Sequence, residues 1–178
     1  YFHFLQDFSG PSLHQRGYRS GQGEAPLKEH LAAALLKRSG WSSDQPLFDP
    51  FCGSGTIIIE AALIALNKAP GLNREGWPGH RANVWQQLKD EARAEVRSLP
   101  AQILCYGSDT DERALAKARQ NIARAGVADY VKVDYADATE LKGSVATIPG
   151  VIVTNPPYGE RLGDLPSLIP LYSKFSLA

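Results

Sequence analysis

Short apolar runs and longer amphipathic stretches alternate along the chain. The short runs are rich in Val, Ile, Leu and Phe and end in turn residues, which is typical of β-strands. The longer stretches carry apolar residues at helical spacing; in residues 111–125, for example, Leu115, Ala118 and Ile122 fall on one face. The pattern predicts strands at residues 46–49, 103–107, 130–133 and 151–153, and helices at residues 24–39, 56–67, 82–98 and 111–125.

This order of elements predicts an α/β fold, a doubly wound and mostly parallel sheet with helices on its faces. Sheets of this kind bind ligands beyond the carboxyl ends of their strands. The polar residues that stand out in the sequence follow those ends; they are Asp49, Asp109, Asp137 and Asn155. The sequence therefore predicts a ligand site assembled from the ends of several strands.

The two ends of the chain have weaker patterns. Residues 1–5 alternate like a strand, and the glycine-rich stretch that follows predicts a loop. The sequence contains no Met, begins at Tyr1 and stops at Ala178 inside an apolar, helix-like stretch. We therefore expect the chain to be a piece of a longer protein, with a sheet that is incomplete at its C-terminal end.

A glycine-rich turn follows the first predicted strand, in residues 49–56 (Asp-Pro-Phe-Cys-Gly-Ser-Gly-Thr). Its two glycines let the backbone approach a ligand closely, and the next helix presents free amide N–H groups at the same place. A dinucleotide fingerprint would need a third glycine where Ile58 stands, and a phosphate loop would need Gly-Lys-Ser/Thr. On local sequence alone, a tight strand-to-helix turn without a ligand explains the pattern equally well.

Two acidic residues beyond later strands are candidates for contacts to a nucleoside. Asp109 can accept hydrogen bonds from both hydroxyls of a ribose. Its alternative role is a helix N-cap, for which Asp111 is better placed. Asp137 can accept a hydrogen bond from the exocyclic amine of an adenine or be a solvated loop residue, and Asp134 is its weaker competitor.

The tetrapeptide Asn155-Pro156-Pro157-Tyr158 is the most specific feature. An amine on a base ring is a poor nucleophile because its lone pair is delocalised. Hydrogen bonds from that amine to the Asn155 side-chain oxygen and the Pro156 carbonyl would favour a pyramidal nitrogen, and two prolines would hold the carbonyl in place. Tyr158 can stack on the base, which is worth about 1–3 kcal/mol. The four residues therefore predict chemistry on an sp2 amine.

Composition and charge limit the partners, the compartment and the metal sites that can be expected. Lys and Arg number 19, as do Asp and Glu, and zero net charge argues against a stand-alone nucleic-acid clamp. Two cysteines, Cys52 and Cys105, cannot form a disulfide framework, so we expect a reducing, cytoplasmic compartment. The four histidines have no metal-ligand spacing, and no apolar run approaches the ~20 residues that span a membrane. We expect neither a metal site nor a membrane partner.

Several segments together resemble the THUMP-associated RNA methylase family. They are residues 9–19, 23–29, 48–56, 69–72 with the helix around Trp85, and 155–162. The resemblance covers nearly the whole chain and implies a class I, Rossmann-like methyltransferase fold. It also implies S-adenosylmethionine as the cofactor and, as the substrate, the exocyclic N2 amine of a guanine in 23S ribosomal RNA.

The resemblance implies roles for individual residues. The target base would be held by Asn155, Pro156, Pro157 and Tyr158. The cofactor would be bound by Pro26, Asp49, Pro50, Cys52, Gly53, Gly55, Asp109 and Asp137. In this set the glycine-rich turn would line the methionine end, Asp109 would hold the ribose and Asp137 the adenine amine. The segment around Pro26 would close over the cofactor.

The family also implies how the chain is divided. Its members carry an N-terminal THUMP domain that binds RNA, so residues 1–23 would be a linker or strand extension from that domain. Residues 24–178 would be the N-terminal part of the methyltransferase domain. A complete sheet of this kind has seven strands, and the three that are not predicted here would follow residue 178.

Other functions remain open on the residues themselves. The tetrapeptide equally suits the N6 amine of adenine in DNA or the amide nitrogen of a protein glutamine. A non-catalytic RNA-binding module is a rival of a different class. One small basic and aromatic cluster could touch phosphate and base or form a solvated loop; it comprises His14, Arg16, Tyr18 and Arg19.

Overall fold

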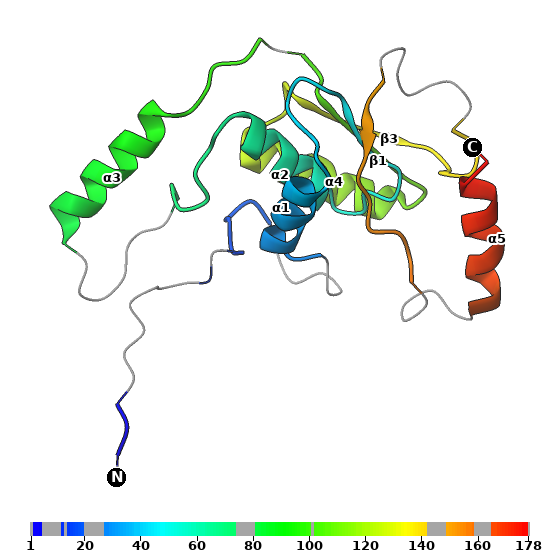
Figure 1. Cartoon of the computed structure of the whole chain (residues 1–178), viewed down its shortest axis with the longest axis horizontal. Coiled ribbons are helices and arrows are strands. Elements are labelled where there is room, and N and C mark those ends of the chain that lie inside the picture. Colours follow the sequence, from blue (N-terminus) through cyan, green and yellow to red (C-terminus); the bar gives the residue numbers. More distant parts are fainter. Residues whose placement is uncertain are drawn as a thin grey trace.

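The computed structural model describes residues 2–4, 12, 14–19, 27–73, 81–100, 102–141, 149–158 and 165–177. In chain order the elements are α1 (Glu29–Arg38), β1 (Leu47–Asp49), α2 (Thr56–Ala65), α3 (Ala82–Ala94), β2 (Cys105–Asp109), α4 (Glu112–Ala125), β3 (Val131–Tyr135), β4 (Val151–Ile152) and α5 (Leu165–Phe175). Figure 1 shows α1 beside α2, with α3 and α5 at opposite sides of the view.

The strands form a parallel sheet in the order β3-β2-β1-β4. Leu47 of β1 lies in register with Cys105 of β2 on one side and with Val151 of β4 on the other. The chain thus builds outward from β1 to β3 and then returns to the opposite side of β1. Ligands bind at this reversal of strand order in open α/β sheets. The predicted parallel sheet is confirmed, and its switch point lies between β1 and β4.

Helix α2 is almost entirely apolar, and other elements enclose it. It contacts α1, α4 and the sheet, and eight of its ten residues are buried. A helix of this composition is stable only where it is covered all round. Ile58 and Ile59 are both fully buried, so truncating either to Ala would cost about 2–5 kcal/mol of stability. This core holds the glycine-rich turn that precedes α2.

Helix α4 begins and ends with well-defined caps. The Asp111 side chain accepts a hydrogen bond from the Arg113 amide at 2.8 Å, and Gly126 ends the helix with a φ of 68°. A left-handed residue at this position favours glycine. The prediction that Asp111 caps this helix is confirmed. Asp109 is therefore not the N-cap of α4.

The structure differs from the predicted elements at the periphery. Residues 2–4 are not a strand, because Phe2 and Phe4 are almost fully exposed and have no sheet beside them. Helix α1 begins at Glu29, later than predicted, because Lys28 has an extended backbone. Helix α3 ends at Ala94, earlier than predicted, and none of its residues is buried.

Two general properties follow from the described ranges. None of their helices combines the length and the apolar character that crossing a membrane requires. In the same ranges, no three side chains of the His, Cys, Asp and Glu types gather in a group that could hold a metal ion.

Candidate functional site at the ends of the strands

The glycine-rich turn is folded tightly against the end of β2. The Cys52 amide donates to the Ser108 carbonyl at 2.9 Å, and the Gly53 amide donates to Asp109 Oδ2 at 2.8 Å. A Cβ atom built on Gly53 would meet nothing within 4 Å, so the space beside this residue is open. The turn therefore offers a fixed backbone next to an open space.

Glycine is required at two positions for close packing around this turn. Gly55 has a φ of 84°, and a Cβ atom there would lie 3.3 Å from the Cβ atom of Ala118. At Gly107 in β2, a Cβ atom would lie 2.8 Å from both Cys52 Cβ and Ile58 Cδ1. Sequence reasoning missed Gly107, although an isolated glycine in a strand is a known sign of close approach by another backbone segment.

Asp109 joins the turn to the end of β2 through both carboxylate oxygens. Besides the bond from Gly53, its Oδ1 accepts from the Asp111 amide at 2.9 Å. The side chain is only half-buried. Each carboxylate oxygen can accept a second hydrogen bond. Asp109 can therefore support the turn and still accept hydrogen bonds from ribose hydroxyls.

The ends of β1 and β4 meet through a direct side-chain hydrogen bond. Thr154 Oγ1 donates to Asp49 Oδ1 at 2.6 Å, although these residues are 105 positions apart in the chain. The ladder supports the contact, because the Val153 amide donates to the Phe48 carbonyl at 3.1 Å. The glycine-rich turn and the tetrapeptide that begins at Asn155 therefore start from adjacent strand ends.

The tetrapeptide itself is open to solvent. Asn155 is exposed, Pro156 and Pro157 are half-buried, and Tyr158 is 57% exposed. Within the described ranges, the Asn155 side chain makes no hydrogen bond. Its amide oxygen is therefore available to an incoming amine, and the ring of Tyr158 is available for stacking.

Helix α5 contacts both motifs. The Tyr172 hydroxyl donates to the Pro157 carbonyl at 2.7 Å, and the rings of Phe175 and Phe51 lie edge to face with centroids 5.4 Å apart. Phe51 belongs to the glycine-rich turn, so α5 links that turn to the tetrapeptide. Local spacing in the sequence contains no signal for this contact.

Asp137 lies beyond β3 and starts a short turn. Its Oδ1 accepts hydrogen bonds from the amide and the hydroxyl of Thr139, both at 2.8 Å, and these bonds lower the pKa of Asp137. The side chain is exposed. Its competitor Asp134 forms an ion pair with Lys132 at 2.8 Å on the surface of the sheet. Asp137 stays ionised and exposed, as an acceptor for an adenine amine would have to be.

Burial controls the acid–base state of three other groups. It raises the pKa of Asp49 to about 7, against the effect of hydrogen bonds from Thr154 and Phe51. It also raises the pKa of the Cys52 thiol, and that of Cys105 to about 12. Both thiols are therefore protonated at neutral pH, which fits packing roles rather than a nucleophile.

The basic and aromatic cluster before α1 faces inward. Arg16 forms an ion pair with Glu60 of α2 at 3.0 Å, and the Tyr18 hydroxyl donates to the same carboxylate at 3.1 Å. Arg19 forms an ion pair with Glu29 at 3.3 Å. For these arginines and Tyr18 the predicted solvated loop is wrong, because a buried carboxylate on α1 or α2 engages each of them, whereas contact with RNA stays a prediction. Pro26 lies outside the described residues.

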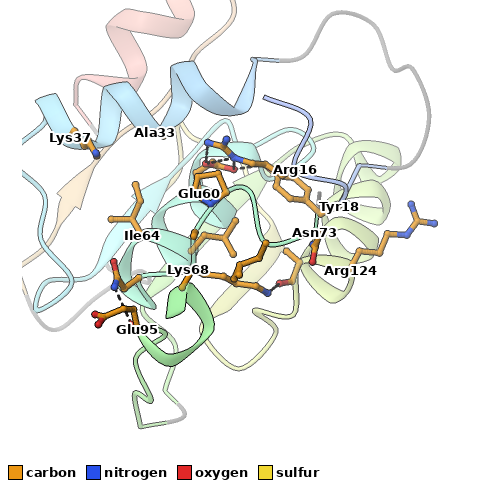
Figure 2. Close-up of a pocket in the computed structure, with 17 residues that line it drawn as sticks. Arg16, Tyr18, Ala33, Lys37, Glu60, Ile64, Lys68, Asn73, Glu95 and Arg124 are labelled. Carbon is orange, nitrogen blue, oxygen red and sulfur yellow. Dashed lines mark hydrogen bonds and ion pairs between the residues drawn. The ribbon is translucent and has the colours of Figure 1, made fainter. Parts of the chain in front are cut away.

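A cavity of about 560 Å³ lies away from the strand ends (Figure 2). Arg16, Tyr18 and Glu60 form part of its wall, and Ile64 and Lys68 line it near the C-terminal end of α2. The glycine-rich turn instead precedes the N-terminus of the same helix. Among the described residues, none of those predicted to hold the cofactor or the target base lines this cavity, so it is separate from the candidate site.

The residues at the strand ends fit S-adenosylmethionine. The open space beside Gly53 leaves room for a ligand against the turn. Asp109 has acceptor capacity left for a ribose, and the exposed Asp137 carboxylate can receive an amine. Asp49 places a buried carboxyl group beside the turn. These residues would hold the cofactor, which supplies a methyl group when bound.

Comparison with known proteins identifies the family to which this chain is similar. Residues 16–178 match the family of RMKL-like methyltransferase domains. Proteins named ribosomal RNA large subunit methyltransferase K/L are 51% identical over 174 residues in Shewanella baltica and 52% identical over 175 residues in Shewanella amazonensis. Each alignment covers 93% of this chain but 24% of the relative, so the chain spans about a quarter of the relatives' length.

Solved structures give the same fold. A possible methylase from Clostridium difficile has a TM-score of 0.85 and 42% identity, covering 95% of this chain and 45% of that one. A protein described as a methyltransferase and solved with SAH, the demethylated cofactor, has a TM-score of 0.82 and 41% identity over 93% and 43% of the two chains. A Listeria monocytogenes protein named as an N6-adenine-specific DNA methylase has a TM-score of 0.84 and 40% identity over 94% and 44%.

These findings confirm the predicted fold class and agree with S-adenosylmethionine as the predicted cofactor. The glycine-rich turn, Asp109 and the Asn-Pro-Pro-Tyr segment lie where a parallel sheet of this class places its ligand site. The sequence match and the structural similarity show that this chain belongs to the family of RMKL-like methyltransferase domains.

Proposed function

We propose that the protein transfers a methyl group from S-adenosylmethionine to the exocyclic N2 amine of a guanine in 23S ribosomal RNA. The observation that carries this proposal is the hydrogen bond between Thr154 and Asp49. It brings Thr154, the residue before Asn155, against Asp49 at the start of the glycine-rich turn, which supports one shared site for the cofactor and a base amine.

When bound, S-adenosylmethionine supplies an electrophilic methyl group. The chain's own part is to position the target amine and to make its lone pair available. The Asn155 side-chain oxygen and the Pro156 carbonyl would each accept one N–H bond from the amine, and Tyr158 would stack on the base. Pro156 and Pro157 restrict the backbone, so the acceptors are in place before the base arrives. Orientation of this kind is a large part of the rate enhancement.

No strong general base is required for this reaction. The amine loses its proton readily once it has become alkylated and positively charged, and water can take it up because the tetrapeptide is exposed. Asp49 is unsuited to the task, since its carboxyl group is buried and already accepts hydrogen bonds from Thr154 and Phe51. Its role is to hold the two strand ends together.

The choice of ribosomal RNA rests on the relatives named above, which share about half of this chain's residues. Their names identify large-subunit ribosomal RNA as their substrate. They are about four times as long as this chain, so the proposal concerns the protein of which this domain is a part. The choice of guanine N2 comes from the THUMP-associated family that the motifs resemble.

Adenine-N6 methylation of DNA is the second candidate. It is favoured by the Listeria monocytogenes neighbour, whose name specifies that reaction and whose structure has a TM-score of 0.84 to this chain. The acceptors of the tetrapeptide suit the adenine amine as well as the guanine amine. The zero net charge does not separate the two substrates.

Transfer of a labelled methyl group tests the two candidates side by side. The complete protein is incubated with undermethylated 23S ribosomal RNA, with double-stranded DNA and with a release-factor protein that has a glutamine acceptor. We expect label only in the RNA, recovered as N2-methylguanine after digestion. Label in DNA as N6-methyladenine would replace the proposal with the second candidate. Binding of RNA without any transfer would indicate a non-catalytic module.

A further inference from the structure

Arg19 joins three segments of the chain at the edge of the candidate site. We propose that Arg19 is a positioning residue for the cofactor, which ties Leu27 at the entry to α1 to Thr56 beside the glycine-rich turn and thereby raises cofactor affinity. The inference rests on the proposed use of S-adenosylmethionine at that turn. It adds a role for a residue that touches neither the cofactor turn's glycines nor the target-base tetrapeptide.

The contacts of Arg19 are specific and short. Its Nη2 donates to the Leu27 carbonyl and to Thr56 Oγ1, both at 2.5 Å. Its Nε lies 3.3 Å from Glu29 Oε1. One guanidinium group therefore binds the chain entering α1, the first turn of α1 and the first residue of α2.

The partners of Arg19 lie beside the glycine-rich turn, which links these contacts to cofactor binding. Thr56 directly follows Gly55, the last glycine of the turn. Leu27, at the entry to α1, is half-buried against the core. If Arg19 releases Leu27 and Thr56, the entry to α1 loses its fixed position relative to the turn. The cofactor would then have to order these residues on binding, which lowers affinity.

The chemistry requires arginine rather than any cation. The planar guanidinium group presents several N–H donors in a fixed fork, so it can face Glu29 while it donates to Leu27 and Thr56. A lysine ammonium is a single point of charge and cannot span the same three partners. Lysine would nevertheless keep a positive charge near Glu29, whose carboxylate is buried. The Arg19→Lys variant therefore removes the bridging geometry without leaving a buried charge uncompensated.

Arg16 provides a matched control. It lies on the same segment and forms an ion pair with Glu60 of α2 at 3.0 Å, with side-chain exposures of 8% and 3%. Figure 2 shows this pair at the wall of the separate cavity. Glu60 is one helical turn beyond Thr56, away from the glycine-rich turn. Arg16→Lys thus makes the same chemical change at similar burial, but without a contact to Leu27 or Thr56.

The experiment compares the complete wild-type protein with the R19K and R16K variants. SAH binding is measured by calorimetry, KM for S-adenosylmethionine and kcat by methyl transfer, and melting temperature without ligand. For R19K we expect about tenfold weaker SAH binding and a similar rise in KM, with kcat at saturating cofactor within twofold of wild type. For R16K we expect unchanged SAH affinity, together with a fall in melting temperature comparable to that of R19K.

Three results would count against the inference. Equal SAH affinity of R19K and wild type would overturn it. Equal losses of affinity in R19K and R16K would also overturn it, because both would then follow from general destabilisation. If wild-type protein binds no SAH while the site is intact, the proposed function itself fails. That result is distinguishable, since it appears before any variant is compared.

Discussion

The two halves of the candidate site differ in how far they are prepared before a ligand arrives. In the glycine-rich turn of residues 49–56, Asp49 is buried, and the amides of Cys52 and Gly53 donate to Ser108 and Asp109 at the end of β2. At residues 155–158 the chain is largely exposed, and within the described ranges the Asn155 side chain has no hydrogen-bond partner. The backbone of the cofactor half is already held by hydrogen bonds within the protein, whereas the Asn155 side chain of the target half is free to accept one.

This difference separates stability from catalysis within one site. Changes in the cofactor half should affect folding and affinity together, because the same atoms hold the backbone and face the ligand. Changes in the target half should affect turnover with little effect on folding. The substitutions below test that separation, beginning with the largest expected effect.

Asn155→Ala should lower kcat by about 10²–10³-fold, since it removes a preorganised acceptor of the target amine. SAH affinity and melting temperature should stay close to wild type, because the Asn155 side chain has no hydrogen-bond partner within the described ranges. Single-turnover methyl transfer and calorimetry measure the two quantities. Unchanged turnover would remove Asn155 from the mechanism, and a large loss of stability would break the contrast between the two halves.

Asp49→Asn should change how stability depends on pH. The folded protein holds this carboxyl group with a pKa of about 7, whereas its ordinary value is 3.8. Its stabilising contribution is therefore complete below about pH 4 and is lost as pH rises through 7. Asn is neutral throughout, so at pH 8 the variant should be more stable by on the order of 3 kcal/mol.

Urea unfolding of cofactor-free protein between pH 4 and pH 8 measures this effect. The exposed Asp134→Asn variant is a suitable control, because Asp134 lies on the solvated side of the sheet in an ion pair with Lys132. If D49N and wild type lose stability in parallel across this range, Asp49 is ionised in the folded protein.

Thr154→Val should have a smaller effect on both halves at once. It removes the hydrogen bond to Asp49 while nearly conserving side-chain volume, at an expected cost of about 1–2 kcal/mol in stability. Because Thr154 precedes Asn155, kcat should fall by about tenfold. Thr154→Ser keeps the hydroxyl and should restore most of both losses. Failure of the serine variant to restore kcat would show that this hydrogen bond does not align the two strand ends.

Tyr172→Phe should have the smallest effect. The variant keeps the ring and removes only the hydroxyl that donates to the Pro157 carbonyl. The bond is partly open to solvent, with Tyr172 39% exposed, so we expect a cost of about 0.5–1 kcal/mol and a change in kcat below threefold. A loss of turnover as large as that of N155A would instead give α5 a direct part in catalysis.

Local sequence was sufficient to predict most of the strands and helices. The apolar runs predicted all four strands that the described residues form, and turn chemistry at Gly55 and Asp111 predicted where α2 and α4 begin. Polar residues directly after apolar strands predicted the edge of the sheet at which the site lies. These signals can be recognised in the sequence because each depends only on residues a few positions apart.

The contacts that give the site its geometry could not be predicted in this way. Arg19 and Thr56 are 37 residues apart, and Thr154 and Asp49 are 105 apart. Charge alone marked Arg16 and Arg19 as surface residues, because the carboxylates that pair with them, Glu60 and Glu29, look like ordinary helix residues in the sequence. Their burial is a property of the packed α1 and α2 helices.

The pairing of β1 with β4 also affects how the protein is made. On the ribosome, β1, β2 and β3 are synthesised well before β4, so the early chain contains the glycine-rich turn without the Thr154 hydroxyl that donates to Asp49. Contacts at such long sequence separation slow folding. The nascent domain therefore cannot assemble its complete site until the strand at residues 151–152 has inserted beside β1.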